Sequence, residues 1–152
     1  MASGVYTRGA LAIANGTIDP ETSTIKAMLL EAGYTFNPDH EFVDEAGTDV
    51  LSAEASGTGY AAGGWGGASR KTLATKALLV DDTNNLVKLT FDPIVWSGIN
   101  CGTIVALVLI VEGVADDTTS RLISYHDITD VVTNGGDLTI TLGSNGAIRW
   151  LV

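Results

Sequence analysis

The apolar run from Ile104 to Val111 constrains the fold of this chain more than any other stretch of its sequence. Its residues are mostly β-branched or otherwise branched, and such residues favour strands. No polar residue alternates with the apolar ones, so the run predicts a central strand buried on both faces. It is also too short to span a bilayer, for which a helix needs about 20 residues. The run therefore predicts the middle of a sheet.

Further strand patterns surround this run, and polar turn signals separate them. The turns are the polar stretch 81–85 and the Ser-Asn-Gly of 144–146, where Asn-Gly favours a tight hairpin. Several short strands with turns between them indicate an antiparallel β-sandwich or barrel, and residues 1–152 are interpreted as one domain. The predicted strands are 24–30, 73–80, 86–91, 94–97, 121–126, 138–142 and 148–152.

Short helices are expected only near the N-terminus. Apolar residues at helical spacing predict one helix from Tyr6 to Asn15, and Gly16 follows as a stop. Asn37 and Pro38 suit the cap and the first position of a second helix, which would end near Ala46. The expected fold class is mainly β, with one or two short helices.

The charge balance excludes one class of partner. The chain has 18 acidic and 8 basic residues, which gives a formal net charge of −10 at pH 7. The basic residues are scattered, and Arg70-Lys71 is the only adjacent pair, so no patch suits nucleic acid. The start of the chain lacks a signal-peptide pattern, so we expect a soluble protein made in a cytoplasm, with no membrane partner.

A glycine-rich segment at about 56–69 is the most unusual part of the sequence. A phosphate-binding loop would continue with Lys and then Ser or Thr, and a dinucleotide loop would need a different glycine spacing, so neither fits. Two structural alternatives remain. The segment is a plain surface loop, or it is an arm that orders only against a neighbouring subunit.

In the second alternative, aromatic residues within the segment anchor it to the partner, because aromatics are enriched at interface hot spots. The glycines then let the backbone lie flat on the partner, and two residues near the N-terminus add contacts. The candidate partner-contact residues are Val5, Tyr6, Gly57, Gly59, Tyr60, Gly63, Gly64 and Trp65.

The residue types needed for chemistry are present without the spacing that chemistry requires. His40 and Asp44 lie one helical turn apart, but a zinc-protease helix would carry a second histidine at position 44. Asp81-Asp82 and Asp116-Asp117 lack the alternating carboxylates of a calcium loop and are interpreted as turns. We expect no metal site.

Cys101, His126 and Asp127 include the residue types of a thiol triad, but no spacing supports one. Cys101 is the only cysteine, so an intrachain disulfide is impossible. It opens the most apolar strand, where a free cysteine packs as a small hydrophobe. We therefore expect no catalytic residue and no cofactor, and predict that the chain is not an enzyme.

Several motifs follow one another along the chain in a specific order: a TIK-LL strand, then HEF, then GTGY, then a V-W strand. The segments concerned are Asp19–Pro20, Thr24–Leu30, Tyr34–Phe42, Ser56–Tyr60, Leu86–Phe91, Ile94–Ser97 and 104–111. In this order of motifs the chain resembles small structural proteins of tailed bacteriophages. The resemblance spans nearly the whole chain, from the N-terminal helix to the apolar strand.

The resemblance implies a virion component without enzymatic activity, and it assigns no functional residues. A net charge of −10 suits a surface outside the shell better than one facing packaged DNA. We therefore expect a capsid decoration protein that binds the major capsid protein, as a symmetric homo-oligomer. The alternative is a tail, baseplate or receptor-binding tip component.

Overall fold

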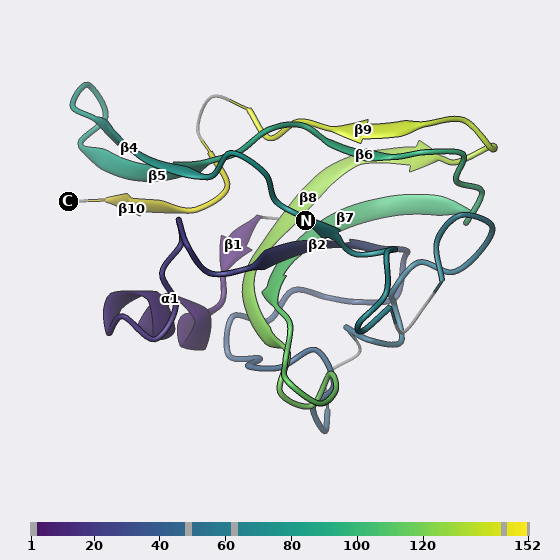
Figure 1. Ribbon diagram of the computed structural model, residues 1–152, viewed down its shortest axis with the longest axis horizontal. Coiled ribbons are helices and arrows are strands. Elements are labelled where there is room, and N and C mark those ends of the chain that lie inside the picture. Colours follow the sequence, from purple (N-terminus) through teal and green to yellow (C-terminus); the bar gives the residue numbers. More distant parts are fainter. Residues whose placement is uncertain (1–2, 48–49, 62–63, 144–145, 152) are drawn as a thin grey trace.

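The apolar run forms β7 (Thr103–Val111), the middle strand of the largest sheet. The computed structural model describes residues 3–47, 50–61, 64–143 and 146–151. The sheet is antiparallel, and Figure 1 shows its long strands crossing the centre of the molecule. Its order is β1 (Gly4–Val5), β8 (Arg121–Val132), β7, β2 (Ile25–Leu30) and β3 (Lys71–Thr72).

Both faces of β7 are buried, as the sequence predicts. Leu107 and Leu109 belong to one hydrophobic cluster, whereas Ala106, Val108 and Ile110 belong to a second cluster on the opposite face. The neighbouring strand β2 divides its residues in the same alternating way. The sheet therefore needs a covering layer on each side.

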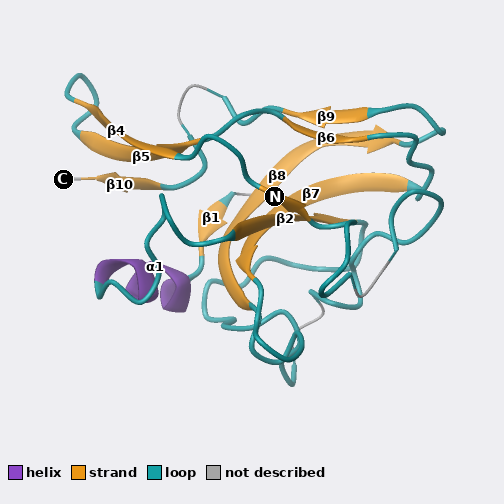
Figure 2. Cartoon of the chain, in the orientation of Figure 1, coloured by secondary structure: helices purple, strands orange, loops and turns teal. Residues whose placement is uncertain are grey.

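Two small sheets cover the first face. One has the order β10 (Arg149–Leu151), β5 (Leu86–Thr90), β4 (Ala77–Asp81), and the other pairs β6 (Ile94–Trp96) with β9 (Leu138–Ile140). Both lie above the large sheet in Figures 1 and 2. Leu89, Trp96 and Ile140 from these sheets share a cluster with residues of β2 and β7, so the space between the layers is the main core. The predicted mainly β, antiparallel fold is confirmed, and of the two predicted architectures, sandwich and barrel, the layered sheets fit the sandwich.

The second face is covered by irregular chain and not by a third sheet. The rings of Tyr34 and Phe36 pack on Tyr125 of β8, with ring centroids 5.8 and 5.3 Å away. The Tyr6 ring packs edge-on against Phe36, with centroids 5.1 Å apart. Val43 lies in the same buried cluster. This aromatic layer fixes the N-terminal region and residues 34–43 to the sheet.

The predicted N-terminal helix is present as α1 (Thr7–Ala14). Gly16 follows it with φ +77°, a conformation that suits a helix stop. Gly9 lets the helix lie directly on β8, because a Cβ at this position would come within 2.4 Å of the carbonyl oxygen of Leu122.

The predicted second helix, 37–46, is wrong. The Asn37 side chain does accept a hydrogen bond from the Asp39 N–H at 3.0 Å, but it makes a turn and no helix follows. The chain instead pairs with the start of β8: Leu122 N–H donates to Glu41 O, and Val43 N–H donates to Ser120 O. These tertiary bonds use backbone groups that a helix would need internally.

Two strand predictions also need correction. The expected strand 73–80 is interrupted, since Thr75 has φ +52° and β4 begins only at Ala77. The predicted hairpin at 144–146 does not join neighbouring strands, because β9 pairs with β6 and β10 pairs with β5. Residues 144–145 lie outside the described residues.

Candidate assembly surface

The described part of the glycine-rich segment is folded against its own chain. Tyr60 is only 1% exposed, and its hydroxyl donates to Glu54 Oε1 at 3.0 Å while accepting the Leu29 N–H at 3.1 Å. Burial, followed by the neighbouring Glu54 charge, raises the pKa of Tyr60 well above its usual value. Tyr60 is therefore a core residue, and the prediction that it anchors a partner is wrong for its side chain.

The glycines of this segment permit close packing within the chain. A Cβ at Gly57 would lie 2.3 Å from Asn100 O, and one at Gly59 would lie 3.0 Å from Gly98 O. Backbone bonds join Thr58 and Asn100 in both directions. These two glycines pack against the 98–101 loop of the same chain. Both are also exposed, so their contact with another subunit stays a prediction. Gly63 lies outside the described residues.

The two N-terminal candidates also pack within the chain itself, to different extents. Tyr6 is completely buried, and its hydroxyl donates to the Tyr34 hydroxyl at 3.1 Å. Burial raises the pKa of Tyr6 above its usual value. Val5 is half-buried and packs against the main core. Tyr6 is thus a structural residue of the aromatic layer, which corrects its assignment as a partner contact.

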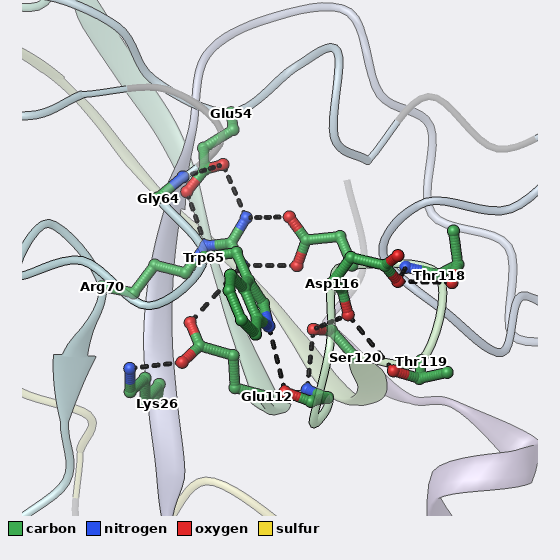
Figure 3. Close-up of polar contacts among 12 residues, drawn as sticks. Lys26, Glu54, Gly64, Trp65, Arg70, Glu112, Asp116, Thr118, Thr119 and Ser120 are labelled. Atoms are coloured by element: carbon green, nitrogen blue, oxygen red, sulfur yellow. Dashed lines mark hydrogen bonds and ion pairs between the residues drawn. The ribbon is translucent and has the colours of Figure 1, made fainter.

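Arg70 follows the glycine-rich segment and forms a buried ion cluster (Figure 3). Its guanidinium makes two bidentate contacts. Nε and Nη2 donate to Glu54 at 2.8 and 2.7 Å, and Nη1 and Nη2 donate to Asp117 at 2.6 and 2.9 Å. Burial acts to lower the pKa of Arg70, but the bonds from Glu54 and Asp117 outweigh it and raise the pKa. The guanidinium stays charged.

This Arg70 cluster joins loops that are far apart in the sequence. Glu54 also accepts the Gly64 N–H at 3.4 Å, and Glu112 lies 3.7 Å from Arg70 while binding Lys26 at 2.5 Å. The cluster therefore clamps the end of the glycine-rich segment to the loop that follows β7. Bidentate Arg–carboxylate geometry fixes orientation as well as distance.

Among the described contact candidates, Trp65 has the most exposed side chain, with 38% of its surface exposed. Its indole N–H donates to the carbonyl oxygen of Gly113 at 3.0 Å, which holds the ring beside that loop. The next residue, Val114, is 99% exposed. Trp65, Gly113 and Val114 are referred to below as the Trp65 surface.

An apolar groove of about 350 Å³ continues from Val114. Its lining includes Ile18, Val111 and Ala115, and Arg121 lies at its border. The groove and the Trp65 surface share the 113–115 loop. An exposed tryptophan, an exposed valine and an apolar depression together provide the features of a protein-contact site.

The residues considered for catalysis have structural partners. Cys101 is buried beside Thr133, whose hydroxyl lies 3.8 Å from the sulfur, and burial raises the pKa of the thiol. His126 bonds instead with Ser124 Oγ at 2.9 Å. Burial lowers the pKa of His126 to about 4, so the ring is neutral at pH 7.

The side chains of the segment 37–46, which was considered for metal binding, also have partners nearby in the chain. The Glu45 carboxylate accepts the backbone N–H groups of Glu41 and Phe42, and these bonds lower its pKa. His40 Nδ1 lies 3.0 Å from the Tyr34 hydroxyl. Within the described residues, no group of three or more His, Cys, Asp and Glu side chains is arranged to hold a metal ion.

Sequence reasoning missed both the Arg70 cluster and a second exposed apolar element. Asp117 was interpreted as a turn residue, but it forms an ion pair with Arg70. Arg70 was considered only together with Lys71, as a possible contact for nucleic acid. No local pattern joins residues separated by 16 and 47 positions. The exposed side chains of β4 were missed because they continue a pattern that also fits a covered strand.

Comparison with models of protein families, with curated proteins and with solved structures finds no match to this chain. Across the described ranges, none of the helices has the length and apolar character needed to cross a bilayer.

Proposed function

We propose that this protein is a non-enzymatic virion structural protein of a tailed bacteriophage, a decoration protein that binds the outside of the capsid through the Trp65 surface. The observation that carries this proposal is an exposed tryptophan held in a fixed position by the Gly113 carbonyl group. Tryptophan is among the residues most enriched at binding hot spots.

Preorganisation supports an adhesive role for this surface. Arg70 holds together two loops, one that carries Glu54 and one that carries Asp117. Glu54 in turn accepts the backbone N–H of Gly64, the residue immediately before Trp65. A contact that is already ordered in the free protein loses little conformational entropy on binding. The Trp65 surface can therefore contribute more of its buried apolar area to affinity than a mobile arm could.

Location outside the shell is favoured by charge. The net charge of −10 is repelled by packaged DNA, whereas an external surface faces screening solvent. The partner is accordingly the major capsid protein, and the site of action is the virion. The phage assignment itself rests on the resemblance in the order of sequence motifs.

Binding to shells tests this role directly. Shells assembled from the capsid protein of the same genome, without this chain, are mixed with the purified protein, and bound protein is measured after sedimentation. Trp65→Ala is expected to lower the affinity by about 30-fold, since a tryptophan hot spot contributes about 2 kcal/mol or more. Leu11→Ala is the matched control, because Leu11 is an exposed apolar residue on α1.

A wild-type protein that fails to bind such shells would contradict the proposal. If Trp65→Ala and Leu11→Ala lowered the affinity for shells equally, the Trp65 surface would not be the binding site. Copy number separates the capsid from the tail alternative. Quantitative mass spectrometry of particles should give about one copy per capsid subunit for a decoration protein that covers the lattice, and only a few copies for a tail or receptor-binding component.

A further inference from the structure

The strand β4 is an unpaired edge with apolar side chains in solvent. It ends the sheet β10-β5-β4, so among the strands that the structure describes β5 alone is bonded to it. Leu78, Leu79 and Val80 are 36%, 46% and 71% exposed, although consecutive strand residues point to opposite faces. Both faces of the edge are thus apolar. In Figure 1 the β4–β5 hairpin lies at the periphery of the molecule.

The pairing of β4 with β5 determines which backbone groups of β4 point away from the sheet. Residues of an antiparallel strand alternate between those bonded to the neighbouring strand and those that point away from it. The Leu78 N–H donates away from β5, to the Glu21 carboxylate at 3.1 Å. By alternation Val80 points the same way, whereas Leu79 points toward Lys88 of β5. Leu78 and Val80 therefore offer the groups that a further strand would bond.

The sequence of this edge is complementary to itself in the antiparallel direction. With Leu79 opposite Leu79 of a second copy, Leu78 lies opposite Val80, and both can exchange backbone bonds. The same register places Ala77 opposite Asp81, and it places Lys76, whose ammonium group donates to the Ser23 carbonyl oxygen in the single chain, opposite Asp82 of the second copy. Apolar residues thus meet at the centre, and opposite charges meet at both ends. Opposite-charge and apolar cross-strand pairs each stabilise a ladder.

We infer that two copies of this chain associate through antiparallel pairing of β4 with β4, centred on Leu79. The two three-stranded sheets become one continuous sheet across a two-fold axis. The surface is distinct from the Trp65 surface, which consists of Trp65, Gly113 and Val114. A dimer formed in this way can still bind another partner.

Glu21 controls access to this edge. Its carboxylate occupies the Leu78 N–H in the single chain and must leave before the two strands pair. Charged side chains over an edge strand are a common protection against association. Glu21→Ala therefore strengthens the dimer, whereas a surface change unrelated to the interface would leave it unchanged.

Disulfide trapping tests the register. In this arrangement Leu79 forms a non-hydrogen-bonded pair with its counterpart, with Cα atoms about 4.5 Å apart, within the range that a disulfide spans. Leu79→Cys is oxidised alongside Val132→Cys, an exposed valine on β8. The native Cys101 is buried and does not compete. Leu79→Cys is expected to form linked dimers about tenfold faster, and equal rates would overturn the inference.

Sedimentation equilibrium measures the uncross-linked dimer, at about 0.5 M salt to screen the net charge. Leu79→Lys places like charges opposite each other and is expected to weaken dimerisation by about tenfold or more, whereas Val132→Lys leaves it unchanged. A wild-type chain that stays monomeric, or a Leu79→Lys chain that dimerises normally, overturns the inference. Dimerisation through β4 without binding to shells would contradict the proposed function alone.

Discussion

Replacing Arg70 with methionine is the strongest single test of how the loops are held together. The substitution keeps much of the apolar volume and removes the guanidinium. It leaves Glu54 and Asp117 facing each other, with side chains 0% and 7% exposed, and without the cation that binds both. The expected result is a large loss of stability, because an uncompensated buried charge is costly.

The magnitude follows from the burial of the pair. Removing one partner of a buried ion pair costs about 3–5 kcal/mol. For a chain of this size, 1 kcal/mol lowers the melting temperature by about 2–4 °C, so Arg70→Met should lower it by about 6–20 °C. Thermal unfolding followed by circular dichroism, with urea unfolding for the free energy, measures the change.

Arg121→Met is the matched control. Arg121 makes a 2.7 Å ion pair with Glu41, but both side chains are partly exposed, at 25% and 30%. Arg121 also lies over the Phe42 ring, with 4.9 Å to its centroid. Its loss should cost about 1 kcal/mol. Similar losses for the two variants would refute the view that the Arg70 cluster clamps the loops. Adding Glu54→Gln to Arg70→Met should recover part of the loss.

Three further predictions concern a buried histidine, a buried cysteine and a closely packed glycine. Burial lowers the pKa of His126 to about 4 in the folded protein. Between pH 6.5 and 4 the unfolded chain therefore binds more protons than the folded one, and the free energy of unfolding falls by about 3 kcal/mol as the pH drops through this window. His126→Gln should flatten this slope in urea unfolding, and an unchanged slope would contradict it. Cys101 should react with a thiol reagent only after unfolding, because it is buried; rapid labelling of the native protein would refute this. Gly57→Ala should cost about 1–3 kcal/mol by overlap with Asn100, and Gly143→Ala should not, since its Cβ meets no atom within 4 Å.

Local sequence patterns correctly predicted the secondary-structure elements that a strong apolar pattern specifies. The run at 104–111 predicted a doubly buried strand, and β7 is one. The spacing from Tyr6 to Asn15 predicted α1 to within one residue at each end. These elements are specified by apolar pattern and by a glycine stop, both of which can be read along the chain.

Tertiary bonds decided the elements that were predicted wrongly. Asn37 has the side chain of a helix cap, yet the residues after it bond to β8. Tyr60 lies among glycines, which predicted exposure, but its hydroxyl satisfies a backbone N–H of β2 inside the core. Among the described contact candidates, Trp65 has an exposed side chain in a fixed orientation. Its indole N–H is held by the Gly113 carbonyl group, 48 positions away in the sequence.

The double burial of β7 has a consequence for the chain before it is folded. An unpaired apolar, branched segment of this length has the composition that promotes aggregation. During synthesis β2 emerges before β7, but β8 emerges after it, so one edge of β7 stays open while the next residues are made. Glu112, Asp116 and Asp117 follow immediately and place negative charge beside that edge. These carboxylates oppose intermolecular stacking in the nascent chain, and two of them later bind Arg70 in the finished protein.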